Sequence, residues 1–195
     1  MTCSPVNNMP GMRAGARRNT SQCILFACIL LLTSLCGAAQ ADAIPSYIGR
    51  HGSSSEDTRA IEKVVEDFRS AIKTRNPRLL STLVLHSAIL FDTPAPPDAI
   101  ANVREKTDVT FNGIRSSGYR DFATFLGTTR SEVEEKFYNV KITQDNNVAW
   151  VMFDYEFLIG GKAQNYGVET WQMMKVQDGA WKIVSVVWTM NRVPA

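Results

Sequence analysis

The sequence predicts an α+β domain in which a few helices come first and a long antiparallel meander follows. Two observations support this class. Apolar residues recur at helical spacing between residues 56 and 83, whereas after residue 131 they alternate with polar residues. Two glycine-containing turn signals, Gly160-Gly161 and Asp178-Gly179, divide the alternating part into strands. Helices that precede such a sheet are expected to pack on one of its faces.

The N-terminal 41 residues have the pattern of a cleavable secretory signal peptide. Arg13, Arg17 and Arg18 precede an apolar core, and Ala39-Gln40-Ala41 supplies the small-x-small pattern of a cleavage site. Asp42 is therefore the predicted mature N-terminus, and the protein is expected to be exported to the periplasm or secreted. With the signal removed, we expect no membrane association.

Three alternatives stay open at this end of the chain. An uncleaved anchor would need roughly 20 strongly apolar residues, and the run here is shorter and contains two polar residues. A lipoprotein would use Cys36, but Leu35 before it is bulky. Translation starting at Met12 would leave a shorter basic region.

Signal cleavage changes what the composition implies. It removes three arginines and no acids, so the net charge goes from +2 to −1, which gives no electrostatic reason to expect nucleic acid as a partner. It also leaves 154 residues without a thiol nucleophile or a disulfide, because the signal contains every cysteine of the chain. These are Cys3, Cys23, Cys28 and Cys36.

The mature chain is expected to begin with a flexible lead-in over residues 42–55, followed by one domain over residues 56–195. Ser53 and Glu56 have the spacing of a capping box for the first helix. The apolar stripe of this helix follows as Ile61, Val64, Val65, Phe68 and Ile72.

A second helix starts at Asn76-Pro77, with Asn76 as N-cap and a buried face of Leu79, Leu80 and Leu83. Residues 88–91 are β-prone, and the proline-rich segment 93–97 is expected to end that strand. One or two short helices are expected over residues 98–130, most clearly at residues 119–126.

The meander is expected as four strands over residues 136–144, 148–159, 163–177 and 181–192. In the second of these, Ala149, Val151, Phe153 and the alternate residues to Ile159 share one side. Leu158 lies on the other side, together with Trp150, Met152, Asp154 and Glu156. We expect these two carboxylates to face solvent, a pocket mouth or a dimer surface.

Three blocks of the chain together resemble the nuclear transport factor 2-like superfamily, in particular its SnoaL-like and ketosteroid-isomerase-like branches. They are residues 64–91, residues 118–126, and a last block that runs from Tyr166-Gly167 through Trp171, Asp178-Gly179 and Trp181-Lys182-Ile183 to Trp188. The resemblance implies a curved antiparallel sheet wrapped around two to four helices, with a deep apolar pocket inside. It also implies that the outer face of the sheet pairs two subunits into a homodimer.

Seven side chains are the candidates for lining this pocket, and a small apolar molecule is the expected ligand. They are Phe68, Tyr119, Phe122, Tyr155, Glu169, Trp171 and Trp188. The tryptophans and methionines of the meander are expected to serve mostly as core.

The resemblance also suggests catalytic residues. An ungapped match places Asp92 at the general-base position of the isomerases, although an aspartate before Thr93-Pro94 is also a natural turn former. The same match places Phe68 where those enzymes have an oxyanion-stabilising tyrosine, and a phenyl ring cannot donate that hydrogen bond. Glu169 is the nearest candidate for the partner acid.

His86 could join Asp92 in acid–base catalysis, while His51 in the lead-in is given no role. The chain has two histidines and no clustered carboxylates, so we expect no metal site. It contains none of the common nucleotide-binding or hydrolase motifs, so we expect no cofactor. Three hypotheses remain: a pocket that binds a small molecule without catalysis, a proton-transfer enzyme using Asp92, and a protein-interaction module using the sheet face.

Overall fold

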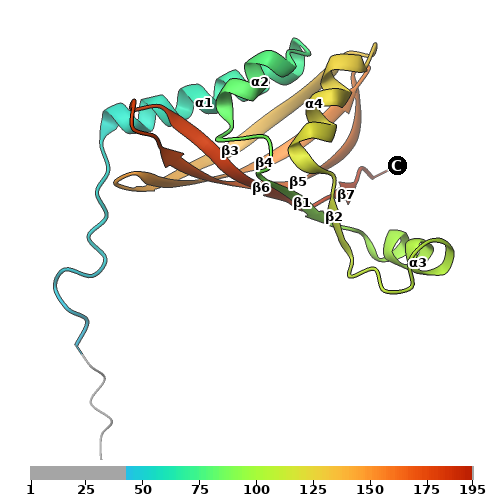
Figure 1. Ribbon diagram of the computed structural model, residues 1–195, viewed down its shortest axis with the longest axis horizontal. Coiled ribbons are helices and arrows are strands. Elements are labelled where there is room, and N and C mark those ends of the chain that lie inside the picture. The colour runs from blue at the N-terminus through green and yellow to red at the C-terminus, as the bar shows by residue number, and fades with distance from the viewer. Residues whose placement is uncertain (1–42, 195) are drawn as a thin grey trace, which may run out of the picture. The chain divides into compact units, whose positions relative to one another are not determined.

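The structure, a computed structural model, describes residues 43–194, so the predicted signal peptide and its cleavage site lie outside the described residues. Four helices and seven strands follow one another in the described part (Figure 1). The helices are α1 (Ser55–Lys73), α2 (Pro77–Leu83), α3 (Pro97–Lys106) and α4 (Gly118–Thr128). The strands are β1 (Leu90–Pro94), β2 (Ile114–Ser116), β3 (Val133–Asp145), β4 (Val148–Ile159), β5 (Lys162–Lys175), β6 (Trp181–Trp188) and β7 (Asn191–Arg192).

The first two helices have the predicted stripes, but α1 is capped one residue later than expected. Its N-cap is Ser54, whose Oγ accepts a hydrogen bond from the Asp57 amide at 3.0 Å, and not Ser53 with Glu56. Adjacent serines offer the same capping group, so spacing could not choose between them. Asn76 caps α2 as predicted, accepting from the Leu79 amide at 2.9 Å.

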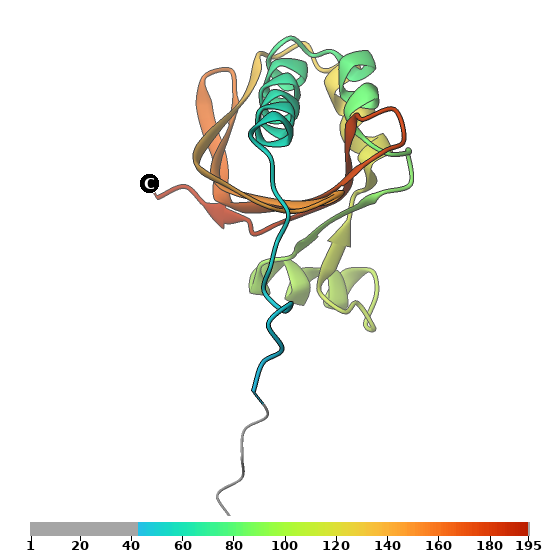
Figure 2. The same cartoon turned by 90° about the vertical axis from the view of Figure 1, so that its left-hand side faces the viewer.

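The sheet is curved and mixed, with strand order β2-β1-β6-β5-β4-β3, and β7 pairs with β5. Strands β3 to β6 form the predicted antiparallel meander. The expectation of a wholly antiparallel sheet was wrong at one place, because β1 pairs with β6 in parallel. The sheet bends around α1, which lies on its concave side (Figure 2).

Several details of the strands differ from prediction. Strand β3 begins at Val133, before the predicted residue 136, and the predicted strand 181–192 is divided into β6 and β7. The first strand extends through Asp92 and Thr93 to Pro94, because its partner β2 prolongs the pairing beyond the proline-rich boundary. In β4, the register shifts between Phe157 and Leu158. Leu158 is therefore buried although simple alternation placed it on the outer side.

The core lies between the stripe of α1 and the concave face of the sheet. The Phe68 ring of α1 lies 4.7 Å from the ring of Trp171 on β5, and Phe153 on β4 packs against the same tryptophan at 5.1 Å. Helix α4 contributes Tyr119 and Leu126 to this core.

Helix α3 differs from the other helices because it has no buried residue and projects away from the layers (Figures 1 and 2). The expectation that the helices pack on one face of the sheet thus fails for this helix. Within residues 43–194, no helix is long and apolar enough to cross a membrane.

A glycine determines how closely the end of the chain approaches the sheet. A Cβ at Gly167 would collide with the backbone oxygen of Thr189. That segment is held there by hydrogen bonds from the Thr189 amide to the Val168 oxygen, at 2.9 Å, and from the Val168 amide to Thr189 Oγ1, at 3.0 Å. Only glycine permits this contact.

Candidate functional site

A cavity of about 430 Å³ lies between the concave face of the sheet and helices α1 and α4. Its walls are mostly aromatic, with rings contributed by α1, α4, β1, β4 and β6. These rings belong to Phe68, Phe91, Phe122, Phe125, Tyr155, Phe157 and Trp188. They support one another: Phe91 lies 5.1 Å from Trp188 and 5.5 Å from Phe122 between ring centroids. The cavity is therefore bounded by packed rings.

Two carboxyl groups, Glu135 of β3 and Glu169 of β5, line this aromatic cavity. Their residues are only 6% and 5% exposed. Burial raises the pKa of Glu169 to about 7, against the opposing effect of a hydrogen bond from Trp171 Nε1 to Oε1 at 2.6 Å. Burial and the negative charge of Glu169 raise the pKa of Glu135 well above its usual value. The protonated forms of both are thus favoured.

Tyr155 lies on β4, the strand between those of the two carboxyls. Its hydroxyl donates toward the backbone oxygen of Thr189 at 2.9 Å and lies 2.9 Å from Asn165 Oδ1. Burial raises its pKa, and the charges of Glu135 and Glu169 raise it further. Tyr155 therefore stays a neutral hydrogen-bonding group next to the acids.

The polar groups at the β2 end of the cavity differ from the two acids because they are exposed. Arg115 of β2 and Ser117, the N-cap of α4, both line the cavity and both face solvent. The pairing of β1 with β2 explains the position of Arg115. It pairs with Thr93, which lies on the same face of β1 as the cavity residue Phe91. The cavity thus has a buried acidic part and an exposed basic residue.

The structure brings together five of the seven predicted lining residues, namely Phe68, Phe122, Tyr155, Glu169 and Trp188. Trp171 lies beneath the wall, where it packs against Phe68 and binds Glu169. Tyr119 is buried in the core on α4, outside the lining of the cavity, and burial raises its pKa.

Asp92 lies outside the lining of the cavity. Along β1, Phe91 and Thr93 are buried, whereas Asp92 between them is half-buried and pairs in register with the exposed Val187 of β6. Because residues paired across strands share a face, Asp92 belongs to the outer face of the sheet. His86 is exposed, and its Nδ1 accepts from the Ala88 amide at 3.2 Å.

Glu135 was missed by the sequence analysis. It belongs to the acidic run 132–135, which is typical of a solvated edge. The signal that could have identified it is alternation, because Val133 and Phe137 flank it at a spacing of two and both pack in the interior. Arg115 lay in a stretch for which no strand was predicted.

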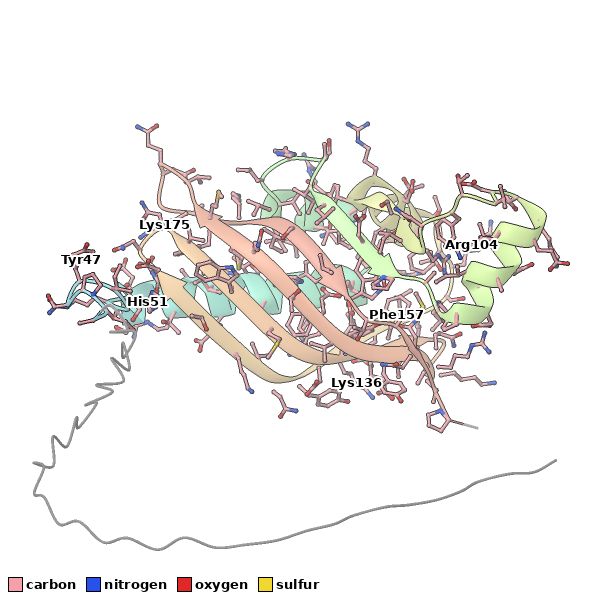
Figure 3. The ribbon with its side chains drawn as sticks, turned by 90° about the horizontal axis from the view of Figure 1, so that it is seen from below. Tyr47, His51, Arg104, Lys136, Phe157 and Lys175 are labelled. Carbon is pink, nitrogen blue, oxygen red and sulfur yellow. The ribbon has the colours of Figure 1, made fainter. Side chains whose placement is uncertain are left out.

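The outer face of the sheet carries the other two carboxylates considered from the sequence. Asp154 accepts from Asn139 Nδ2 at 2.6 Å, and Glu156 lies 3.5 Å from Lys136 Nζ. Both border a shallow hollow on this face together with Tyr138 and Tyr166. Figure 3 looks onto this face, with α1 behind the strands. Among residues 43–194, no three His, Cys, Asp or Glu side chains gather closely enough to hold a metal ion.

No family model matches this sequence, and no curated protein matches it. Several solved structures, in contrast, match this chain. A nuclear transport factor 2-like superfamily protein from Salmonella enterica is 19% identical, with a TM-score of 0.50 over 73% of this chain and 96% of that one. A protein of unknown function from Shewanella baltica, described as NTF2-like, is 12% identical, with a TM-score of 0.51 over 73% of this chain and all of that one.

A third similar structure is described as having a cystatin-like fold. A protein of unknown function with a cystatin-like fold from Nostoc punctiforme is 12% identical, with a TM-score of 0.50 over 71% of this chain and 93% of that one. The chain thus has the nuclear transport factor 2-like fold, as the three sequence blocks predicted. At these identities the likeness establishes the fold, which hosts many functions.

Proposed function

We propose that this domain binds a small molecule with a flat, largely apolar body in the aromatic cavity, outside the cytoplasm. The observation that carries the proposal is the set of seven rings around a volume of about 430 Å³. Concave, mostly apolar cavities with a few polar groups are typical of small-molecule sites. The N-terminal signal pattern supports the compartment.

The test uses a neutral aromatic probe, 1-naphthalenemethanol, whose binding to the purified protein is measured by calorimetry. Phe122→Trp should fill part of the cavity and weaken binding about tenfold, because the larger ring occupies the space of the probe. Tyr47→Trp, an aromatic enlargement at an exposed position outside the cavity lining, is the matched control and should leave the affinity unchanged. Equal affinity in all three proteins would place the binding site elsewhere.

Proton transfer is a second candidate function, and the buried carboxyls favour it. A carboxyl with a pKa raised to about 7 can both accept and donate a proton near neutral pH. The sequence-based candidate Asp92 lies on the outer face of the sheet, so we propose Glu169 as the base for this alternative.

Isomerisation of 3-cyclohexenone to its conjugated isomer, followed by absorbance, tests this alternative. Glu169→Gln should abolish any turnover, and Asp92→Asn should leave it intact. The reverse result would return the role to Asp92. An absence of turnover in the unmodified protein would count against catalysis of this type.

A further inference from the structure

We infer that the ligand of the aromatic cavity carries a protonated amine on its apolar body, and that Glu135 and Glu169 hold this amine. This inference rests on the proposed binding function and names the class of ligand. It follows from the arrangement of the two carboxyls, from their lack of cationic partners, and from the rings around them.

The two carboxyls approach the same space from different strands. Glu135 belongs to β3 and Glu169 to β5, and β4 with Tyr155 lies between them. Both residues line the cavity although both are more than nine-tenths buried. Glu169 lines this cavity alone, whereas Glu135 also borders a second hollow next to Arg69. A molecule in the aromatic cavity would meet both carboxyls.

The carboxyls are short of partners. Glu169 accepts one hydrogen bond, from Trp171 Nε1, and no described residue donates a hydrogen bond to the carboxyl of Glu135. No basic side chain among residues 43–194 lies within 4.0 Å of either group. Burying an acidic group in this way is costly unless it is neutralised by a proton or a cation. A cation from outside would supply what the fold does not.

Three basic side chains border this region, and none of them forms an ion pair with Glu135 or Glu169. Arg69 of α1 borders the second hollow that Glu135 also lines. Its Nη1 contacts Glu66 at 2.8 Å and its guanidinium lies over the Phe137 ring, while its buried Nε has no hydrogen-bond partner among the described residues. Lys136 contacts Glu156 on the outer face. Arg115 lines the cavity from an exposed position, where solvent screens its charge.

The aromatic walls favour a cation for a separate reason. The faces of phenyl, phenol and indole rings attract cations, and this attraction is stronger where water is excluded. Phe68, Tyr155 and Trp188 line the same cavity as the carboxyls. An organic ammonium ion therefore suits both the walls and the acids, whereas an anionic ligand would meet two carboxyls in a desolvated space.

Binding of an amine should also release protons. Burial favours the protonated carboxyls in the empty cavity, and a bound ammonium ion favours the ionised forms. The raised pKa values should therefore fall on binding. Amine affinity should then rise between pH 5 and pH 8, because fewer protons have to be displaced at the higher pH.

The experiment compares three probes of matched shape, 1-naphthylmethylamine, 1-naphthalenemethanol and 1-naphthoic acid, by calorimetry at pH 7.5. The amine should bind at least tenfold more tightly than the alcohol, and the acid should bind more weakly than either. Repeating the amine titration in phosphate and in Tris, whose ionisation enthalpies differ, should show proton release.

The double variant Glu135→Gln, Glu169→Gln should lose the preference for the amine and keep its affinity for the alcohol. Glu134→Gln, an adjacent carboxyl that lies outside the cavity lining, is the matched control and should retain the preference. The probe comparison on the unmodified protein does not depend on the folding of any variant.

The outcomes separate this inference from the proposed function. Equal affinity for the amine and the alcohol, or tighter binding of the acid, would overturn the inference and leave the binding function standing. A preference for the amine that survives in the double variant would also overturn it. A lack of binding by all three probes would count against both.

Discussion

Glu169 combines one hydrogen-bond donor with a position on the cavity wall. Its Oε1 receives the indole N–H of Trp171 at 2.6 Å, and the side chain also lines the cavity. The tryptophan therefore holds the carboxyl in place without neutralising it. A single proton, or a single positive charge in the cavity, decides the electrostatic state of this group.

The raised pKa of Glu169 should make the stability of the protein depend on pH. A carboxyl whose pKa is raised on folding contributes most stability below its unfolded value, and this contribution is lost as pH rises through the folded pKa. A rise from 4.5 to about 7 corresponds to at most about 3 kcal/mol. We therefore expect the protein to be less stable at pH 8 than at pH 5.

Glu169→Gln should reduce this pH dependence and raise stability at pH 8, because the amide oxygen can still accept from Trp171 and carries no charge. Urea unfolding at pH 5 and pH 8 measures both effects. Glu134→Gln is the control and should keep the pH dependence of the unmodified protein. Parallel pH profiles for Glu169→Gln and the unmodified protein would contradict the assignment.

At the scale of single residues, the sequence identified one of the two cavity acids. Glu169 alternates with Trp171 and Met173 in a clear strand, so its inward direction could be predicted. Glu135 could not be separated from its acidic neighbours by composition. An ungapped match assigned Asp92 to the general-base position of the isomerases. Such a match does not contain strand pairing, and it is the pairing of β1 with β2 and β6 that directs this side chain to the outer face.

The start of α1 is joined to the far end of the sheet by one side chain, Asp57. It accepts from Trp181 Nε1 and from Gln144 Nε2, each at 3.0 Å, and its Oδ1 lies 2.7 Å from Lys175 Nζ. These contacts hold the pKa of Asp57 well below its usual range. One carboxylate thus connects a helix to strands β3, β5 and β6.

Asp57→Ala should lower the melting temperature more than Asp67→Ala, which removes only the exposed ion pair with Lys63. The stability that Asp57 contributes is present above its ordinary pKa and is lost as pH falls. The difference between the two variants should therefore shrink at low pH. Calorimetric scans at pH 7 and pH 3 check this, and an equal loss in both variants would argue against it.

Helix α3 should open far more readily than α1. It has no buried side chain, whereas α1 buries six, and local stability follows buried contacts. Native-state hydrogen exchange should show rapid exchange of the α3 amides and strong protection of those in α1. Similar protection in the two helices would indicate a partner surface that covers α3.

At the scale of elements, the strongly periodic segments were the predictable ones. Strand β4 has the predicted bounds, and α2 starts at the predicted residue, because alternation and an Asn-Pro cap are local signals. The parallel pairing of β1 with β6 joins segments that are about a hundred residues apart. No local pattern encodes such a pairing, and the β4 bulge is likewise visible only in the register.

The outer face of the sheet is unusually apolar for a surface. Its exposed large side chains come from β3 to β6 and include Trp150 at 44%, Met152 at 42% and Met174 at 45%. Several exposed apolar side chains on one sheet face are typical of an interaction site. We propose that two copies of the domain pair through this face, as the sequence resemblance implied.

Trp150→Glu should convert such a dimer into a monomer, because a charge would be buried within the paired faces. Light scattering at high protein concentration measures the change. Glu62→Gln on the exposed side of α1 also changes the net charge by one unit and should not alter the mass. A monomeric unmodified protein would rule out this pairing.

The contact between Gly167 and Thr189 lies beside the cavity, because Gly167 pairs with Tyr155 on the inner face of the sheet. The segment that it admits carries the carbonyl that accepts from Tyr155, and the next residue, Met190, forms part of the cavity wall. A methyl group at position 167 would collide with the backbone of Thr189, so this segment, with the acceptor of Tyr155, would have to move. If the domain binds a ligand as proposed, a substitution at position 167, outside the lining of the cavity, should therefore alter its selectivity.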